Sequence, residues 1–136
     1  MDKKQVVFLD DWENWFQGSI DIQPIREVAE VKFISKSLEG NELITALQKC
    51  NVLVLFRERT KITESILKQC KKLERIICTG VQNRNLDLKT AAELGIEVSY
   101  AKGGNSKDST CEITWTLLLS AFKRLNLLTL SSSQPA

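Results

Sequence analysis

Short apolar runs alternate along this chain with segments that have the spacing of amphipathic helices, and this alternation restricts the possible folds more than any other feature. Strands separated by helices and joined by short connections are typical of a parallel sheet with helices on both faces. The five runs that have the character of strands are QVVFLD (5–10), EVKFIS (30–35), NVLVLF (51–56), LERIICTG (73–80) and IEVSY (96–100). We therefore predict an α/β fold: a flavodoxin-like, doubly wound parallel sheet of five strands.

Four segments between the strands favour helices, because each begins with a residue type that starts helices. These are PIREVAE opened by Pro24, ELITALQKC capped by Asn41, ESILKQCKK capped by Thr63, and LDLKTAAELG capped by Asp87 and ended by Gly95. The segment DWENWFQGSI (11–20) is rich in aromatic and turn residues instead. It indicates a loop anchored by Trp12, Trp15 and Phe16.

A last helix, CEITWTLLLSAFKRL (111–125), has apolar residues on almost every side. We expect it to begin near Ser109 or Thr110, after a loop GGNSKDS, and to protrude from the sheet. Its exposed apolar side chains would be Trp115, Leu118, Leu119 and Phe122. Apolar patches of this kind mark protein interfaces. We therefore expect residues 107–130 to form a homodimer or a domain-swapped oligomer.

The predicted organisation has three parts: a sheet domain at 1–105, an interdomain or dimerisation helix at 106–128, and a polar tail at 129–136. The tail LNLLTLSSSQPA does not continue toward a glycine-rich turn. It favours a truncated chain.

Composition excludes several classes of function. The 19 basic and 17 acidic residues leave a net charge of +2, which gives no long-range field for nucleic acid or an anionic membrane. The chain has no histidine and no C-x-x-C spacing among its four cysteines, so we expect no metal site. We find neither a signal peptide nor an apolar stretch of transmembrane length. We expect a cytoplasmic protein whose cysteines are reduced, each a small buried apolar residue.

Two other classes of α/β protein do not fit. Asp10 and Asp11 resemble the acidic pair of a response-regulator receiver, but the third strand ends in Phe56 and Arg57 instead of a phosphoacceptor aspartate. The two acids are then expected to be a solvated strand end. A dinucleotide-binding domain needs G-x-G-x-x-G, whereas the only paired glycines are Gly103 and Gly104.

In doubly wound sheets, ligands bind beyond the carboxyl ends of the strands. The segments at these ends are LDDW, FRERT, TGVQNRN and YAKGGNS. The spacing of R-x-R-T, T-G-x-x-N-x-x-x-D and E-x-T-W, together with VVFLDDW at the start, resembles the D-isomer-specific 2-hydroxyacid dehydrogenases from about Val6 to Leu125. The resemblance implies the substrate-binding domain and linking helix of an enzyme that transfers hydride between NAD(P)H and a 2-oxo acid. The family's NAD-binding Rossmann domain has no counterpart in this sequence.

The resemblance also implies a partial substrate site. The backbone amides of the Thr79-Gly80-Val81 turn would bind a substrate carboxylate, and Arg57 and Arg59 could pair with it. The other residues implied near the substrate are Asn83 and Arg84. The alternative for the two arginines is that they are solvated and paired with Glu58 or Glu64, while Asn85 and Asp87 are turn and cap residues.

On the cofactor side, the family pattern places Asn105, Ser106, Thr110 and Thr114 near the nicotinamide and its ribose. We assign no catalytic residue and expect no tight NAD(P) binding, because a general acid histidine and a phosphate cradle are both absent. Three interpretations of function stay open. The chain is a truncated, inactive homologue, half of a split dehydrogenase that acts with a Rossmann subunit, or a non-enzymatic module that dimerises through its last helix.

Overall fold

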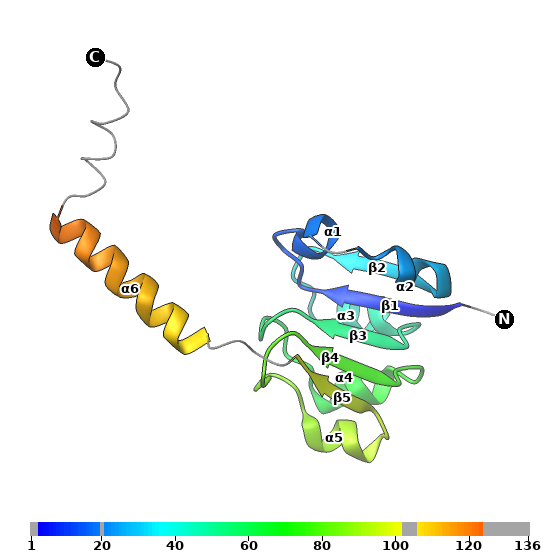
Figure 1. The fold of residues 1–136 in the computed structure, drawn as a ribbon. Helices are drawn as coiled ribbons and strands as arrows, with labels where there is room; N and C mark the ends of the chain where they lie inside the picture. Colours follow the sequence, from blue (N-terminus) through cyan, green and yellow to red (C-terminus); the bar gives the residue numbers. More distant parts are fainter. Residues whose placement is uncertain (1–2, 20, 102–105, 124–136) are drawn as a thin grey trace. The chain divides into compact units, whose positions relative to one another are not determined.

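The five predicted strands form one parallel sheet in a computed structural model that describes residues 3–19, 21–101 and 106–123. The strands are β1 (Lys4–Leu9), β2 (Ala29–Ile34), β3 (Val52–Leu55), β4 (Arg75–Cys78) and β5 (Glu97–Tyr100). They lie in the order β2-β1-β3-β4-β5, and every neighbouring pair is parallel (Figure 1). This is the flavodoxin-like order, so the predicted fold class is confirmed.

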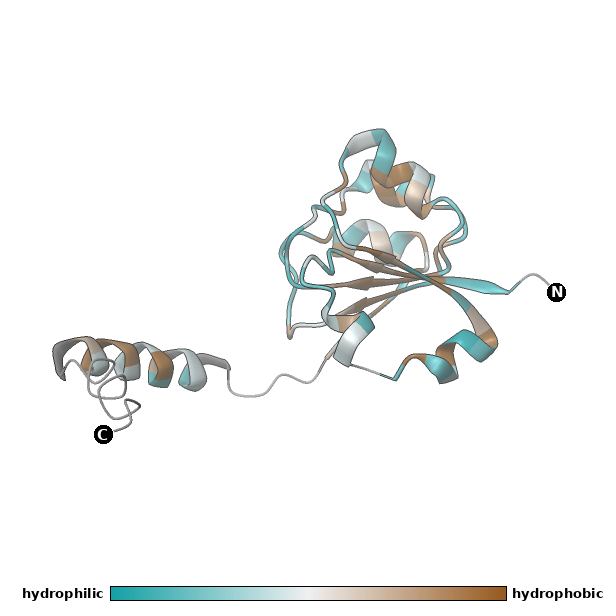
Figure 2. Ribbon diagram, turned by 90° about the horizontal axis from the view of Figure 1, so that it is seen from above, coloured by the Kyte–Doolittle hydropathy of each residue, from teal (hydrophilic) through white to brown (hydrophobic). Residues whose placement is uncertain are grey.

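Helices cover both faces of the sheet, as predicted. α3 (Gly40–Leu47), α4 (Glu64–Gln69) and α5 (Leu88–Glu93) pack on one face, whereas α1 (Trp15–Ser19) and α2 (Gln23–Val28) contribute to the other. Figure 2 shows the sheet nearly edge-on between these two groups of helices. In the described ranges, two short helices cover the α1–α2 face, and the buried cluster on this face is the smaller of the two.

Most of the core lies between the sheet and α3, α4 and α5. Alternate side chains of the central strands point to this face, and Val7, Leu53 and Ile76 have no exposed surface. The smaller cluster on the opposite face includes Val6, Phe8, Val54, Phe16 and Ile25. Both faces of β1 and β3 are therefore buried, which explains why these strands are apolar throughout instead of alternating with polar residues.

The predicted ends of α5 are confirmed. The Asp87 side chain accepts two hydrogen bonds from Thr90, one from the backbone N–H (3.0 Å) and one from the hydroxyl (2.9 Å). Gly95 has a φ of +71°, which glycine adopts without steric cost just after a helix. Local sequence therefore sets both ends of this helix.

The predicted starts of α3 and α4 are confirmed only in part. Thr63 occupies the N-cap position of α4, but its side chain makes no capping hydrogen bond. The prediction for Asn41 is wrong, because α3 begins at Gly40 and Glu39 occupies its N-cap position. Asn41 therefore lies inside the first turn, where the chain has already become helical.

The segment predicted as a loop after β1 contains the short helix α1. The Asp11 carboxylate caps it by accepting hydrogen bonds from the N–H groups of Trp15 (2.7 Å) and Phe16 (3.1 Å). Of the three aromatic residues expected to anchor this segment, only Phe16 packs on the sheet, with its ring centre 5.0 Å from that of Phe8. Trp15 is 48% exposed, so the expectation that it anchors the segment is wrong. Trp12 is 46% exposed and packs against Arg59, whose guanidinium carbon lies 4.3 Å from its ring centre.

α6 (Ser106–Lys123) belongs to a compact unit of its own, residues 103–136, separate from 1–102. It begins before the predicted Ser109, so part of the expected loop GGNSKDS is helical, with Asp108 in the first turn, where an acidic residue is favourable. Cys111 on this helix is exposed, which corrects the expectation that every cysteine is buried. Within the described ranges, no helix is both long and apolar enough to cross a bilayer.

We expect Asp87→Ala to lower the free energy of unfolding by about 1 kcal/mol, because it removes the hydrogen-bonded cap of α5. Thr63→Ala removes a side chain at the same helix position that caps nothing, and should cost less than about 0.5 kcal/mol. Urea unfolding followed by circular dichroism measures both changes. Equal losses in the two variants would contradict the assignment of the cap.

Candidate functional site

Three loops that leave the carboxyl ends of neighbouring strands meet at one edge of the sheet. They follow β1 (residues 10–14), β3 (56–63) and β4 (79–87). The last residues of these strands, Leu9, Leu55 and Cys78, lie side by side in the register of the sheet. The loops therefore begin at the same level. Of the segment after β5, residues 102–105 lie outside the described part of the chain.

Hydrogen bonds tie the β3 and β4 loops to each other. The Arg57 N–H donates to Thr79 Oγ1 (3.2 Å), and the Asn83 side-chain amide donates to the Arg57 carbonyl (3.3 Å). The Arg84 N–H donates to Glu58 Oε1 (2.9 Å). Thr79 and Asn83, both predicted near the substrate, therefore use their side chains to hold the loops together.

The turn at Gly80 and Val81 follows Thr79, which takes part in these hydrogen bonds between the β3 and β4 loops. In the described part of the chain, neither residue's backbone N–H has a hydrogen-bond acceptor. Val81 is 65% exposed, and a Cβ atom on Gly80 would lie 3.4 Å from the Gln82 carbonyl oxygen. The contact is an ordinary one, so a small side chain would fit at this position. The two unpaired amides are the donors that an anion could use here.

Asn85 and Asp87 have the structural roles that the sequence suggested for them. The Asn85 N–H donates to Asn83 Oδ1 (2.9 Å), which forms a side-chain turn, and Asp87 caps α5. The Asn85 side-chain amide also donates to the Glu58 carbonyl (2.6 Å). These residues support the site without facing a ligand.

Arg57 has a strained backbone and an available guanidinium. Its φ is +61°, and the other two non-glycine residues with positive φ in the described ranges, Asp10 and Asn14, lie at the same edge. Such conformations cost roughly 1–3 kcal/mol each and persist where the surroundings impose them. The Arg57 guanidinium carbon lies 5.5 Å from the centre of the Phe56 ring. The side chain is exposed and makes no ion pair with any described residue.

Arg59 is engaged on all sides instead. Nη1 donates to the Asp10 carbonyl (2.8 Å) and to Glu13 Oε2 (2.8 Å), while Nη2 donates to Glu13 Oε1. The guanidinium carbon also lies 4.3 Å from the Trp12 ring centre and 5.0 Å from the Phe56 ring centre. Only 13% of the side chain is exposed. Arg59 thus joins the β1 loop to the β3 loop.

The alternative pairing of the arginines with Glu58 or Glu64 is wrong. Glu64 forms an ion pair with Lys68 one turn along α4, and Glu58 accepts from the Arg84 backbone. The partner of Arg59 is Glu13, which lies on a different loop.

The two acids that close β1 are not a solvated strand end, which corrects the sequence interpretation. Asp10 and Asp11 are 1% and 0% exposed. Asp11 caps α1, and Asp10 Oδ1 accepts a hydrogen bond from the buried Thr60 hydroxyl (2.9 Å). Burial raises the pKa of Asp10 despite this bond, whereas hydrogen bonding to Arg59 lowers the pKa of Glu13 to about 2.

Two of the four residues predicted near a cofactor, Thr110 and Thr114, lie on α6 within the described part of the chain. Asn105 lies outside the described residues, and so does the side chain of Ser106. On α6, the Thr114 hydroxyl donates to the Thr110 carbonyl (2.7 Å), the usual way for a threonine to satisfy its hydroxyl within a helix. The described residues contain no group of three acidic or cysteine side chains that could hold a metal ion.

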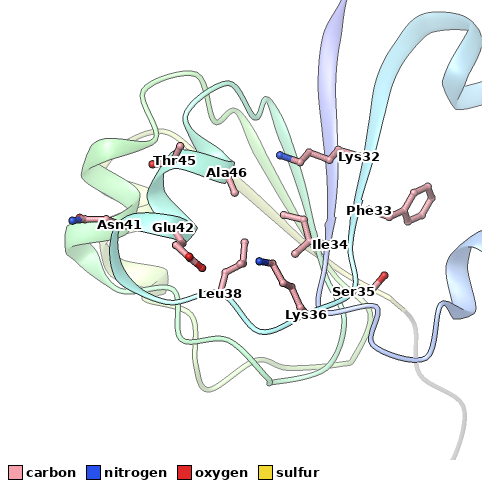
Figure 3. A pocket seen from close by; sticks show the side chains of 10 residues that line it. All are labelled: Lys32, Phe33, Ile34, Ser35, Lys36, Leu38, Asn41, Glu42, Thr45 and Ala46. Carbon is pink, nitrogen blue, oxygen red and sulfur yellow. The ribbon is translucent and has the colours of Figure 1, made fainter.

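An apolar hollow of the sheet domain lies elsewhere, between the edge strand β2 and α3. It has a volume of about 600 Å³, and Ile34, Leu38 and Ala46 form its apolar lining. Figure 3 shows Lys32 and Lys36 extending over it from the strand side. None of the residues predicted near substrate lines this hollow.

The sequence analysis placed Asp10 and Thr60 at this edge but did not predict that they are buried and hydrogen-bonded to each other, and it missed Glu13 altogether. Glu13 follows directly after LDDW, one of the four segments expected at the carboxyl ends. Opposite charges on neighbouring strand ends were therefore the signal that could have paired Glu13 with Arg59.

Comparisons with known proteins show the family of this chain. The catalytic domain of the D-isomer specific 2-hydroxyacid dehydrogenases matches residues 7–133, and the chain belongs to this family. D-3-phosphoglycerate dehydrogenase of Methanocaldococcus jannaschii is 34% identical over 104 residues, which are 76% of this chain and 19% of that protein. Hydroxypyruvate reductase of Thermotoga maritima is 32% identical over 102 residues, 75% of this chain and 33% of that protein. The chain thus spans about a fifth and a third of these relatives.

Solved structures show the same fold. A phosphoglycerate oxidoreductase from Vibrio cholerae superimposes with a TM-score of 0.74 at 28% identity, covering 98% of this chain and 42% of that one. The 3-phosphoglycerate dehydrogenase of Entamoeba histolytica, solved with NAD⁺ bound, has a TM-score of 0.60 at 22% identity and covers 72% of this chain and 32% of that one. These two solved oxidoreductases therefore have the same fold as this chain.

We expect the Glu13 carboxyl to titrate near pH 2, and to move toward its ordinary value of 4.5 in Arg59→Met. Because the pKa is lowered in the folded protein, the pair stabilises the fold above pH 4.5 and this contribution disappears as the pH falls toward 2. Carbon-13 NMR of the glutamate carboxyl groups follows the titration. Arg57→Met serves as the control and should leave it nearly unchanged; an equal effect of both variants would contradict the pairing.

Proposed function

We propose that the carboxyl edge of this sheet binds the carboxylate of a 2-hydroxy or 2-oxo acid, as the substrate-binding part of an NAD-dependent D-2-hydroxyacid dehydrogenase. The observation that carries the proposal is the pair of unpartnered amides at Gly80 and Val81, in the turn that follows Thr79, whose hydroxyl accepts a hydrogen bond from the backbone of Arg57, a residue with an exposed guanidinium. Two amides and one guanidinium are the donors that a carboxylate needs.

The other predicted residues take supporting roles in this proposal. Thr79 and Asn83 fix the Arg57 backbone, so that the start of the β3 loop keeps its position beside the turn when the ligand is absent. Arg84 anchors its loop through its backbone, while its exposed side chain is available at the rim of the site.

Hydride transfer needs a nicotinamide and a proton donor in addition to a carboxylate site. The 136 residues contain no histidine and no G-x-G-x-x-G turn. We therefore assign substrate binding to this chain and the chemistry to residues beyond it, so the chain alone should be inactive. NAD would bind to a Rossmann domain that is either joined covalently to this chain or acts as a separate subunit.

We also propose a cytoplasmic location, because four free cysteines suit a reducing compartment.

Titration with hydroxypyruvate should move the amide resonances of Gly80 and Val81 in a saturable way. Arg57→Ala should weaken the affinity by about tenfold or more, because a hydrogen bond to a charged group contributes roughly 1.5–3 kcal/mol. Arg26→Ala on α2 removes the same charge far from the loops and should leave the affinity unchanged. ¹H–¹⁵N NMR measures both shifts and affinities, and a titration that moves neither amide would refute the proposal.

The same proposal assigns dimerisation to residues 107–130. On α6, Trp115, Leu118 and Leu119 are 64%, 47% and 54% exposed, and their spacing places them on one side of the helix. An apolar stripe of this size favours pairing with a second copy of the same helix, because each copy would cover the stripe of the other.

We expect the chain to be a dimer in light scattering, and Trp115→Lys together with Leu118→Lys to make it a monomer, because two charges would be buried at the interface. Thr116→Lys, which places a charge between these positions on a different side of the helix, is the control and should remain a dimer. A wild-type monomer at high concentration would rule the dimer out.

A further inference from the structure

We propose that Glu13 makes this site selective for unphosphorylated acids, by occupying the arginine that would otherwise bind the phosphate of a phosphorylated acid. The inference rests on the proposed binding of a carboxylate at Gly80 and Val81. It goes further by naming the substrate class: 2-hydroxy and 2-oxo acids that carry one negative charge. Both D-3-phosphoglycerate and hydroxypyruvate enzymes occur among the relatives, so this choice separates two real possibilities.

Arg59 is the cation next to the proposed carboxylate site. Its guanidinium carbon lies 5.0 Å from the centre of the Phe56 ring, and that of Arg57 lies 5.5 Å from the same centre. An acid bound at Arg57 that carried a second anionic group would therefore find Arg59 as a neighbouring cation.

Glu13 already accepts hydrogen bonds from both terminal nitrogens of the Arg59 guanidinium. Its two carboxylate oxygens accept from Nη1 and Nη2, which is the bidentate geometry in which arginine binds phosphate or carboxylate. The second bond of Nη1 goes to the Asp10 carbonyl (2.8 Å), and the Trp12 ring lies 4.3 Å from the guanidinium carbon. A phosphate could use the same end only by displacing Glu13.

Displacing Glu13 is unfavourable for an anion. The Glu13 side chain is 55% exposed, so an approaching phosphate meets its negative charge first. The hydrogen bonds from Arg59 lower the pKa of Glu13 to about 2, so the carboxylate stays ionised in any neutral solution. Like charges held together at a recognition site select against the wrong ligand.

The other basic side chains near these loops are placed less well for a second anion. Lys61 and Arg84 line a hollow between the β3 and β4 loops together with Glu64 and Asp87, and Lys61 also lines a second hollow with Arg59 and Glu39. Carboxylates therefore accompany both cations there. Arg59 is the cation whose release would change the charge next to Phe56.

D-Glycerate and D-3-phosphoglycerate test the inference, because they differ by one phosphate group. We expect the wild-type chain to bind glycerate at least as tightly as phosphoglycerate in an NMR titration followed at Gly80 and Val81. Glu13→Gln should raise the affinity for phosphoglycerate by about tenfold, the gain expected from one additional hydrogen-bonded charge pair, and leave glycerate within about twofold.

Three further variants separate this effect from changes in net charge or folding. Glu64→Gln removes the same charge from an exposed ion pair on α4 and should leave the ratio of the two affinities unchanged. Glu13→Asp keeps the charge and should behave like the wild type. Adding Arg59→Met to Glu13→Gln should abolish the gain, because the freed guanidinium is then gone.

The outcomes distinguish the inference from the proposed function. If the wild type binds neither acid at Gly80 and Val81, the proposed function fails and the inference fails with it. If glycerate binds there but Glu13→Gln leaves the ratio unchanged, or Glu64→Gln changes it equally, only the selectivity of Glu13 is overturned.

Discussion

One row of buried side chains across the sheet fixes the height at which every loop of the site begins. Val7, Leu53 and Ile76 lie side by side in the strand register, and none has exposed surface. A slip by one residue would turn this row to the opposite face, so burial holds the register strongly. Backbone hydrogen bonds continue the same register past the strands, from Phe56 to Leu9 (3.3 Å) and from Thr79 to Leu55 (3.1 Å). The β1, β3 and β4 loops therefore start level, which lets side chains far apart in the sequence meet.

Features that depend on residues close together in the sequence could be predicted, whereas features that depend on contacts between distant segments could not. The strands and the α5 cap depend on periodicity and on residues a few positions apart, and both are confirmed. Asp10 and Asp11 could not be placed from a local pattern, because their burial depends on Thr60 and on the turn into α1. From the local sequence alone, an acidic pair after a strand is expected to be exposed to solvent.

The same distinction holds within the candidate site. The role of the Gly80 turn was implied by the family resemblance, and in the structure Thr79 at the start of this turn accepts a hydrogen bond from the Arg57 backbone. The two arginines, which look alike in R-x-R-T, have different environments: Arg57 is exposed with no ion pair in the described ranges, while Arg59 is held by Glu13 and two rings. Only the contact between loops that leave different strands separates them, and this contact spans 46 positions of the chain.

The distribution of the cysteines gives the two units of the chain different chemical reactivity. Cys50, Cys70 and Cys78 are buried in the sheet unit, and burial raises the pKa of each thiol, that of Cys50 to about 12. The thiolate is the reactive form of cysteine, so these three are protected both by their surroundings and by their protonation. Cys111 on α6 is exposed. A fluorophore or spin label could therefore be attached to that helix alone, in the natural sequence, while the sheet unit stays unmodified.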